Sequence, residues 1–337
     1  MKNALFFILL ILTIISQTAA QNPSPALQEA AKANGEAVKL FGQKKYDEAL
    51  PFAQKAADLR ERELGAAHLE TAQAYRNLGF VQFGRGNRDE AAKAFEKAVD
   101  AFEKNTNLEK KDSHALAELL EYLGALRFQQ KKYQSAEKFY ERAVALRGKL
   151  NGNGAKETIA AALLLGNLKR SNGEFREAVV LYQRVYENRL KSFGAKDTET
   201  QDAYERYRCA LIKNGDKTEA ETLKSEFEIA KNNSQQPSTS TGQIIDGGVI
   251  NLKRAISWGK PPYTEEARKQ RFGGQILTNV IISETGTVLH ACAVNDKAPL
   301  SLLNAVENAA LQTTFQPTTV GGKAVKVIGV LVYNFKP

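Results

Sequence analysis

The stretch that decides the fold lies at residues 129–146 and reads QQKKYQSAEKFYERAVAL. Its centre, KYQSA, returns in related form at four other places along the chain. The five copies are KYDEA at 45–49, RDEA at 88–91, KYQSA at 132–136, EFREA at 174–178 and KTEA at 217–220. Their alanines are 42, 45, 42 and 42 residues apart. A fixed period of this length indicates a repeat architecture.

Each central repeat also carries a glycine and an aromatic residue at fixed distances from its alanine. The glycines, twelve residues before the alanine, are Gly79, Gly124 and Gly166, and the aromatics, four residues after it, are Phe95, Tyr140 and Tyr182. A glycine lets two antiparallel helices approach closely, and the aromatic fills the gap beside them. Because one amphipathic helix pair cannot bury its own apolar face, the units must stack. The pattern predicts about five stacked helix pairs over residues 26–231.

Two segments between the repeats, LGAAHLETA at 64–72 and FGAKDTET at 193–200, echo each other. With the 42-residue period, they resemble the tetratricopeptide repeats of kinesin light chains. In that family the first helix of each pair lines a concave groove that binds proteins or peptides. The resemblance implies groove positions at Gln73, Arg76, Phe80, Phe83, Glu118, Glu121, Phe128, Asn167 and Arg170. For the three phenylalanines, packing between helices is an equally open interpretation.

The composition changes after the last repeat. Residues 232–247 lack periodic apolar positions and are rich in Ser, Thr, Asn, Gln and Gly, which predicts a flexible linker. Residues 248–337 then predict a second, small α+β domain with two helices and a three-stranded antiparallel sheet. Thr264 starts a short helix, a Glu-Thr-Gly turn at 284–286 joins two strands, and an amphipathic helix follows at 300–311. The last strand covers residues 325–335.

Short landmarks in this region occur in the order found in the C-terminal domain of TonB-family proteins. They are Pro262-Tyr263, Glu284-Thr285-Gly286, Phe315-Gln316-Pro317 and Asn334-Phe335. In that family the domain pairs a strand with a peptide of outer-membrane transporters. The resemblance implies that the last strand is an edge that accepts a partner strand, with Val325, Val327, Gly329, Leu331, Tyr333 and Phe335 along it. The alternative is that this strand completes the sheet or pairs with another copy.

The first twenty residues read as an export signal. Lys2 precedes an apolar run over residues 4–15, and small residues follow up to a cleavage point between Ala20 and Gln21. The run has 12 residues, fewer than the roughly 20 needed to cross a bilayer. We therefore expect a cleaved signal and a periplasmic or cell-envelope location in a Gram-negative-type bacterium. The alternative is an inner-membrane anchor of a TonB-like energy transducer for outer-membrane transport. Transducers of that family also have a proline-rich spacer, and this chain has helical repeats in its place.

The charge pattern argues against nucleic acid as a partner. The 47 basic and 38 acidic residues give a net charge of +9, and this charge is spread along the chain without a dense basic stripe. With three histidines and two cysteines in 337 residues, we expect no metal, cofactor or catalytic site, and no enzyme activity. His290 and Cys292 share a strand face without further ligands. Cys209 and Cys292 fall in different predicted domains, which favours two buried thiols over a disulfide that would tie down the linker.

Together these features predict an exported scaffold or adaptor. One partner would bind in the groove of the helical repeats, and another would add a strand to the C-terminal domain.

Overall fold

The computed structural model describes residues 23–105, 108–233, 244–295 and 297–337. The chain divides into two compact units, one ending at Leu150 and the other beginning at Asn151. The predicted signal at residues 1–20 lies outside the described residues, and so do residues 234–243 of the predicted linker. No helix within the described ranges has both the length and the apolar character needed to cross a membrane.

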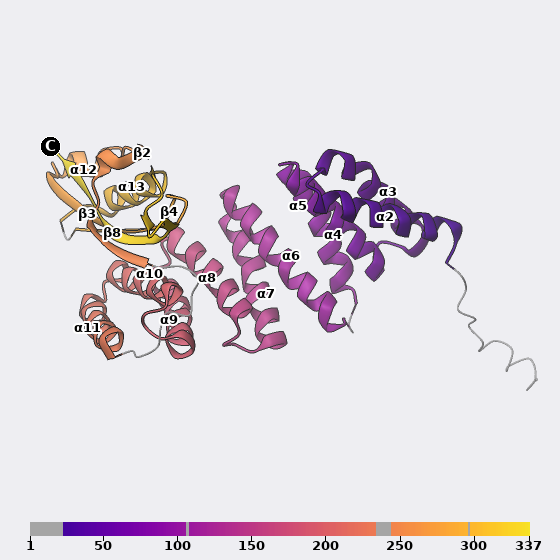
Figure 1. The fold of residues 1–337 in the computed structure, drawn as a ribbon, viewed down its shortest axis with the longest axis horizontal. Helices are drawn as coiled ribbons and strands as arrows, with labels where there is room; N and C mark the ends of the chain where they lie inside the picture. Colours follow the sequence, from indigo (N-terminus) through magenta and orange to yellow (C-terminus); the bar gives the residue numbers. More distant parts are fainter. Residues whose placement is uncertain (1–22, 106–107, 234–243, 296) are drawn as a thin grey trace, which may run out of the picture. The chain divides into compact units, whose positions relative to one another are not determined.

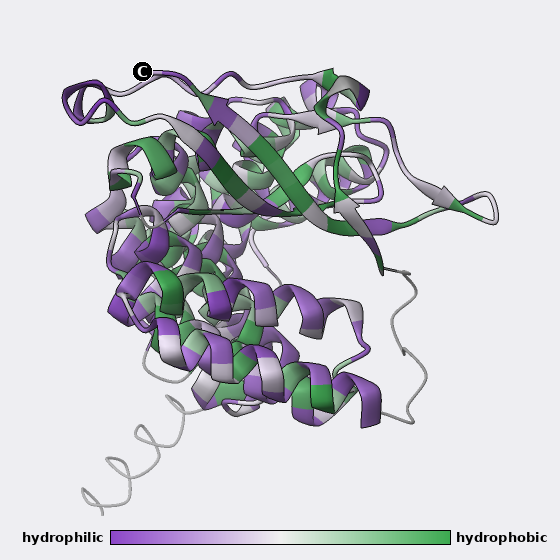
Figure 2. Cartoon of the chain, turned by 90° about the vertical axis from the view of Figure 1, so that its left-hand side faces the viewer, coloured by the Kyte–Doolittle hydropathy of each residue, from purple (hydrophilic) through white to green (hydrophobic). Residues whose placement is uncertain are grey.

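In its described residues the first unit has six helices, arranged as successive helix–turn–helix pairs (Figure 1). They are α2 (Pro25–Gly42), α3 (Tyr46–Leu64), α4 (Leu69–Gly84), α5 (Arg88–Glu103), α6 (Lys110–Gln129) and α7 (Tyr133–Asn151). Apolar and polar residues are mixed along the helices of the chain, as Figure 2 shows for those nearest the viewer. The apolar faces meet in one core that contains Phe95, Phe102, Leu119 and Leu123, all fully buried.

The glycines of the repeat sit where an aromatic ring of the next helix touches the backbone. A methyl group at Gly79 would lie 2.4 Å from the Phe95 ring, and one at Gly124 would lie 2.5 Å from the Tyr140 ring. At Gly166 in the second unit the distance to Tyr182 would be 3.0 Å. Real Cβ atoms essentially never approach another heavy atom within 3.0 Å. The glycine and the aromatic therefore belong to one packing contact that the three central repeats reproduce.

The second unit begins with four more helices of the same kind. They are α8 (Lys156–Ser171), α9 (Phe175–Phe193), α10 (Thr198–Asn214) and α11 (Lys217–Asn233). Asp197 caps α10, because its carboxylate accepts the backbone N–H groups of Glu199 and Thr200 at 3.1 and 3.0 Å.

A strand-rich domain completes the second unit. Its elements are β1 (Ile244–Val249), a short 3-10 helix (Leu252–Arg254), β2 (Ala255–Ser257), α12 (Glu265–Lys269), β3 (Gly274–Ile282), β4 (Val288–Val294), α13 (Leu300–Leu311), β5 (Thr314–Phe315), β6 (Thr319–Val320), β7 (Lys323–Ala324) and β8 (Lys326–Phe335). The main sheet has the order β1-β8-β3-β4. The predicted fold class, tetratricopeptide helices followed by a small α+β domain, is confirmed.

The core of this domain lies between the sheet and α13. Leu302 and Val306 of α13 are fully buried against Ile276 and Leu331 of the sheet. Along β8 the alternate residues Val327, Leu331 and Tyr333 point into this core, and the residues between them are half-buried. Both faces of β8 are thus largely covered, as a central strand requires.

The prediction that the last strand is an edge is wrong over its first half. The antiparallel hairpin of β3 and β4 was expected, and β8 pairs antiparallel with β3. On its other side, however, β8 pairs in parallel with β1 from Lys326 to Val330. Ile250 then donates its N–H to the carbonyl of Val330 at 2.8 Å. Gly329 permits this approach, because a side chain there would lie 2.5 Å from the Ile250 side chain.

The residues named for strand addition therefore have other roles. Val325, Val327, Leu331 and Tyr333 are buried core residues, Gly329 makes room for Ile250, and Phe335 packs on Tyr263. The predicted linker over residues 232–247 is likewise wrong at its ends, because α11 reaches Asn233 and β1 starts at Ile244.

Candidate functional site

A polar cavity of about 520 Å³ opens on the first unit between α4 and α6. It is lined by Gln73, Arg76, Asn77, Lys111, Asp112, His114, Ala115, Glu118 and Arg147. Gln73 of α4 donates a hydrogen bond to the Asp112 carboxylate of α6 at 3.1 Å, which links the two helices that form the walls of the cavity. Positively charged, negatively charged and amide side chains line this cavity, and they suit the polar groups of a peptide backbone.

An apolar cavity of about 350 Å³ adjoins the polar one. Its walls come from α2, α4 and α6, namely Ala37, Val38, Phe41, Arg76, Asn77, Phe80, Val81, Glu118 and Tyr122. The Phe80 and Tyr122 rings meet edge to face with centroids 5.1 Å apart, and Val38 at the rim is 50% exposed. Burial, followed by the nearby charge of Glu118, raises the pKa of Tyr122, so its hydroxyl stays protonated. The cavity beside these two rings has room for a single apolar side chain.

The two cavities share a wall made by an ion pair. Arg76 and Glu118 meet at 2.6 Å and line both spaces, as does Asn77, which donates to Asn34 at 2.8 Å. The Arg76 guanidinium also lies 4.9 Å from the centre of the Phe80 ring. We call the two cavities together the α4–α6 groove. Of the predicted groove residues, Gln73, Arg76, Phe80 and Glu118 line it.

Three other predicted groove residues of the first unit do not line either cavity. Phe83 packs on Tyr122 with ring centroids 5.6 Å apart, and Phe128 packs on Tyr133 at 5.7 Å. These two rings therefore pack between helices, which is the alternative interpretation given above. Glu121 accepts a 2.8 Å hydrogen bond from Arg147, which also contacts His114 at 3.3 Å.

The last two predicted groove residues, Asn167 and Arg170 of α8, contact other parts of the second unit. The Asn167 side-chain oxygen accepts from the Tyr182 hydroxyl at 2.8 Å and from Arg206 at 3.1 Å. Arg170 contacts Glu307 of α13 at 3.3 Å. This part of the helical surface is occupied by the chain's own C-terminal domain.

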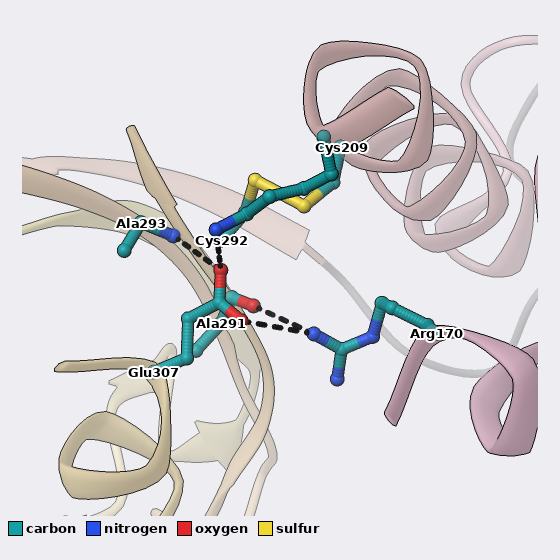
Figure 3. Close-up of a disulfide and its surroundings, with 7 residues drawn as sticks. Arg170, Cys209, Ala291, Cys292, Ala293 and Glu307 are labelled. Atoms are coloured by element: carbon teal, nitrogen blue, oxygen red, sulfur yellow. Dashed lines mark hydrogen bonds and ion pairs between the residues drawn. A yellow bond between two sulfur atoms is a disulfide. The ribbon is translucent and has the colours of Figure 1, made fainter. Parts of the chain in front are cut away.

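Glu307 is the centre of that contact (Figure 3). One carboxylate oxygen accepts the Ala293 N–H of β4 at 2.9 Å and lies 2.9 Å from the Lys213 ammonium of α10. The other oxygen faces Arg170. The side chains of Glu307 and Lys213 are only 9% and 4% exposed, so this is a buried charge cluster.

A disulfide between Cys209 of α10 and Cys292 of β4 lies beside Glu307 (Figure 3). The interpretation of these residues as two free thiols is therefore wrong. It assumed separate domains, whereas the C-terminal domain packs on α10 and brings the Cα atoms to 5.9 Å. Cys209, Cys292 and Glu307 place their ligand atoms within 4.8 Å of one another, but the two sulfur atoms are bonded to each other.

Two further groups flank the disulfide. Arg206 is held by Asp202 at 2.9 Å and reaches the Leu289 carbonyl, and His290 is fully buried on β4. Burial, followed by the charges of Arg206 and Arg170, holds the pKa of His290 well below its usual value. In the first turn of α10, Glu199 accepts a hydrogen bond from the Lys326 ammonium of β8 at 2.7 Å. Burial alone would raise the pKa of Glu199, but Lys326 and Arg189 hold it below the ordinary value.

The sequence contained one usable sign of this cluster. Glu307 lies one helical turn after Leu303, on the apolar face of the helix at 300–311. An acidic residue on a buried face needs partners. The sequence does not show that those partners are Lys213 and Arg170, because they are 94 and 137 residues away.

Comparison with protein families agrees with the two parts of the fold. Residues 29–104 and 115–191 match the tetratricopeptide repeat family. Residues 259–337 match the family described as Gram-negative bacterial TonB protein C-terminal. No curated protein matches the chain.

Among solved structures, a Podosopora anserina protein with nearly identical TPR-like repeats, described as kinesin light chain, is 17% identical with a TM-score of 0.49. The match covers 64% of this chain and all of that one. BtubC (BKLC) from P. vanneervenii is 20% identical over 67% of this chain and all of its own, with a TM-score of 0.41. YrrB, a TPR protein with an unusual peptide-binding site, is 20% identical over 66% of this chain and 92% of its own, with a TM-score of 0.42.

Proposed function

We propose that this chain, which carries tetratricopeptide repeats followed by a TonB C-terminal domain, is an exported adaptor of the Gram-negative cell envelope. It binds an extended segment of another protein in the α4–α6 groove. The observation that carries the proposal is the pair of adjoining cavities, one polar and one apolar, that share the Arg76–Glu118 ion pair. Tetratricopeptide folds bind proteins or peptides, and a TonB C-terminal domain is an envelope domain, which agrees with this reading.

The shape of the groove specifies the bound segment. An aliphatic or aromatic side chain enters the apolar cavity and contacts Phe80, Tyr122 and Val38. The peptide groups beside it face Gln73 and Asn77, whose amides can both donate and accept. Because the lining charges of the polar cavity are mixed, specificity comes mainly from the apolar side chain and from the register of the backbone.

Export is supported by the sequence of residues 1–20 and by the disulfide. Disulfides form and persist in oxidising compartments such as the periplasm and are rare in the bacterial cytosol. Cys209 and Cys292 are the only two cysteines of the chain, and they are paired. The proposal therefore includes cleavage after Ala20 and a mature chain beginning at Gln21. It assigns the chain binding without a catalytic step.

The C-terminal domain has a different role from the one expected. Strand addition along β8 is not part of the proposal, because β1 already pairs with its first half. Instead the domain is anchored to α8 and α10 through Glu307 and the disulfide. It therefore covers part of the helical surface, and the α4–α6 groove belongs entirely to the other unit.

The experiment is an equilibrium titration of full-length mature protein with peptides selected on it from a random displayed library. Val38→Glu puts a charge at the rim of the apolar cavity without removing a core residue. The matched control is Val180→Glu, at an apolar residue of α9 that is 62% exposed. We expect Val38→Glu to weaken binding at least tenfold and Val180→Glu to leave it within twofold. Equal effects of the two variants, or no selected peptide, would contradict the proposal.

A further inference from the structure

The Cys209–Cys292 disulfide is surrounded by ionisable groups as well as apolar ones. Both half-cystines are 2% exposed, and a Glu307 carboxylate oxygen lies within 4.8 Å of both sulfur atoms. Lys213 stands four residues after Cys209 on α10, so the two share one helix face, and its ammonium is 2.9 Å from Glu307. A cation near a sulfur stabilises the thiolate, and a neighbouring carboxylate can accept a thiol proton.

The disulfide also links α10 to β4, and the contact between these two elements covers an edge of the sheet. β4 is the outer strand next to β3 in the order β1-β8-β3-β4. Its outward backbone groups bond to side chains rather than to another strand. The Ala291 carbonyl accepts from Arg170 at 3.5 Å, the Leu289 carbonyl accepts from Arg206 at 3.5 Å, and the Ala293 N–H donates to Glu307. Side chains of α8 and α10 thus satisfy the two carbonyls of an edge that is otherwise available for pairing. The Ala293 N–H is satisfied by Glu307 of α13, which Arg170 and Lys213 hold in place.

We propose that Cys209–Cys292 is a thiol–disulfide exchange site, and that its reduction by a dithiol frees the β4 edge from α8 and α10. One thiolate of the reductant attacks a cysteine sulfur, forms a mixed disulfide and releases the other cysteine as a thiolate. The second thiol of the reductant then attacks the mixed disulfide and releases the second cysteine. The protein gains two electrons and two protons, and the reductant becomes a disulfide.

Burial makes this exchange depend on movement of the domain. A reductant cannot reach sulfurs that are 2% exposed until β4 separates from α10. In the oxidised state the covalent bond brings the parts back together after every separation. In the reduced state non-covalent contacts alone hold them, among them those of Glu307 and Lys326, so separation becomes more frequent. The inference stands apart from the proposed groove, because it concerns the second unit alone.

The test measures the intact mature protein in dithiothreitol buffers without denaturant. Thiols are trapped by alkylation and counted by mass, and backbone amide exchange is followed at β4 in the oxidised and reduced forms. We expect no alkylation before reduction, two alkylated cysteines after it, and at least tenfold faster exchange of the Ala293 amide. Cys292→Ser should show the same faster exchange without reductant.

Each opposite result would overturn the proposal. Alkylation of untreated protein would show that no disulfide forms. If the disulfide is reduced only in denaturant, it is a structural crosslink that does not exchange in the folded protein. Unchanged exchange at Ala293 in the reduced wild-type protein would show that the disulfide does not control the β4 edge. The wild-type comparison needs no variant, so it remains decisive if Cys292→Ser fails to fold.

Discussion

Arg76 of α4 and Glu118 of α6 are 42 residues apart and meet at 2.6 Å, and their ion pair is the common wall of the two cavities in the first unit. The glycines of these two repeats, Gly79 and Gly124, are 45 residues apart, so the pair joins the first helices of successive repeats at positions three residues out of register. Both side chains are about one third exposed, at 31% and 36%. The pair therefore serves to shape the groove more than to stabilise the fold.

The Arg76–Glu118 pair should contribute little to stability. Ion pairs of this exposure are worth about 0.2–1 kcal/mol in double-mutant cycles. We expect a coupling below about 1 kcal/mol from the Arg76→Met, Glu118→Gln and double variants in urea unfolding. The same variants should each weaken binding of a selected peptide more than fivefold. A coupling well above this limit, or unchanged binding, would assign the pair a purely structural role.

Replacing the glycine at the helix crossing by alanine should lower the free energy of unfolding, whereas the same change on an exposed helix face should not. Gly124→Ala places a methyl group 2.5 Å from the Tyr140 ring, and we expect a loss of about 1–3 kcal/mol in unfolding free energy. Gly35→Ala in α2 meets no atom within 4 Å and should stabilise by up to about 1 kcal/mol. Urea denaturation of both variants gives the comparison, and effects of the same sign would contradict the packing assigned to the repeat.

Removing the charge of Glu307 should destabilise the second unit. Glu307→Gln leaves Lys213 buried without a counterion within 4 Å among the residues that the structure describes, and breaking one side of a buried pair costs about 3 kcal/mol or more. The matched control is Glu265→Gln, whose exposed pair with Lys269 should be worth less than about 0.5 kcal/mol. The measurement is urea unfolding of oxidised protein, and a loss no larger than that of the control would contradict the buried cluster.

The free energy of unfolding should decrease as the pH is lowered below the ordinary pKa of histidine. The folded-state pKa of His290 is lowered by burial and by Arg206 and Arg170, so the unfolded chain binds a proton that the folded chain does not. Stability from neutral His290 is complete above about pH 6.5 and is lost as the pH falls, by up to about 1.4 kcal/mol per pH unit.

The variant His290→Phe isolates this contribution. Neither ring nitrogen of His290 has a hydrogen-bond partner in the described structure, so an apolar ring loses no hydrogen bond. We expect the stability difference between His290→Phe and wild type to grow in favour of the variant from pH 7 to pH 5. A difference that stays constant over this range would show that His290 does not titrate with unfolding.

Local patterns were enough to predict most elements of the fold. The helix at 300–311 is present with the predicted limits, and two strands flank the turn at 284–286 as predicted, because apolar periodicity and turn residues define these elements within a few positions. The glycine and aromatic residues of each repeat were also informative, since their partner lies at a fixed spacing.

Contacts between distant segments could not be predicted in this way. β1 contains Asp246, Gly247 and Gly248, which are poor strand formers, and its partner β8 begins about eighty residues later. The pairing of Cys209 with Cys292 depends on docking of the C-terminal domain, which no spacing reveals. Asn167 and Arg170 were correctly placed on the first helix of their repeat, but that position does not show which part of the chain covers them.

The most direct test of the adaptor is site-specific photo-crosslinking in a Gram-negative host that makes the full chain. A photoreactive residue at Val38 lies at the rim of the apolar cavity, and one at Val180 lies on α9 with similar exposure. We predict a discrete protein adduct from Val38 in the periplasmic fraction, lost when Arg76→Met is added, and none from Val180. No adduct from Val38, or the same adducts from both positions, would contradict the claim that this groove binds a protein partner.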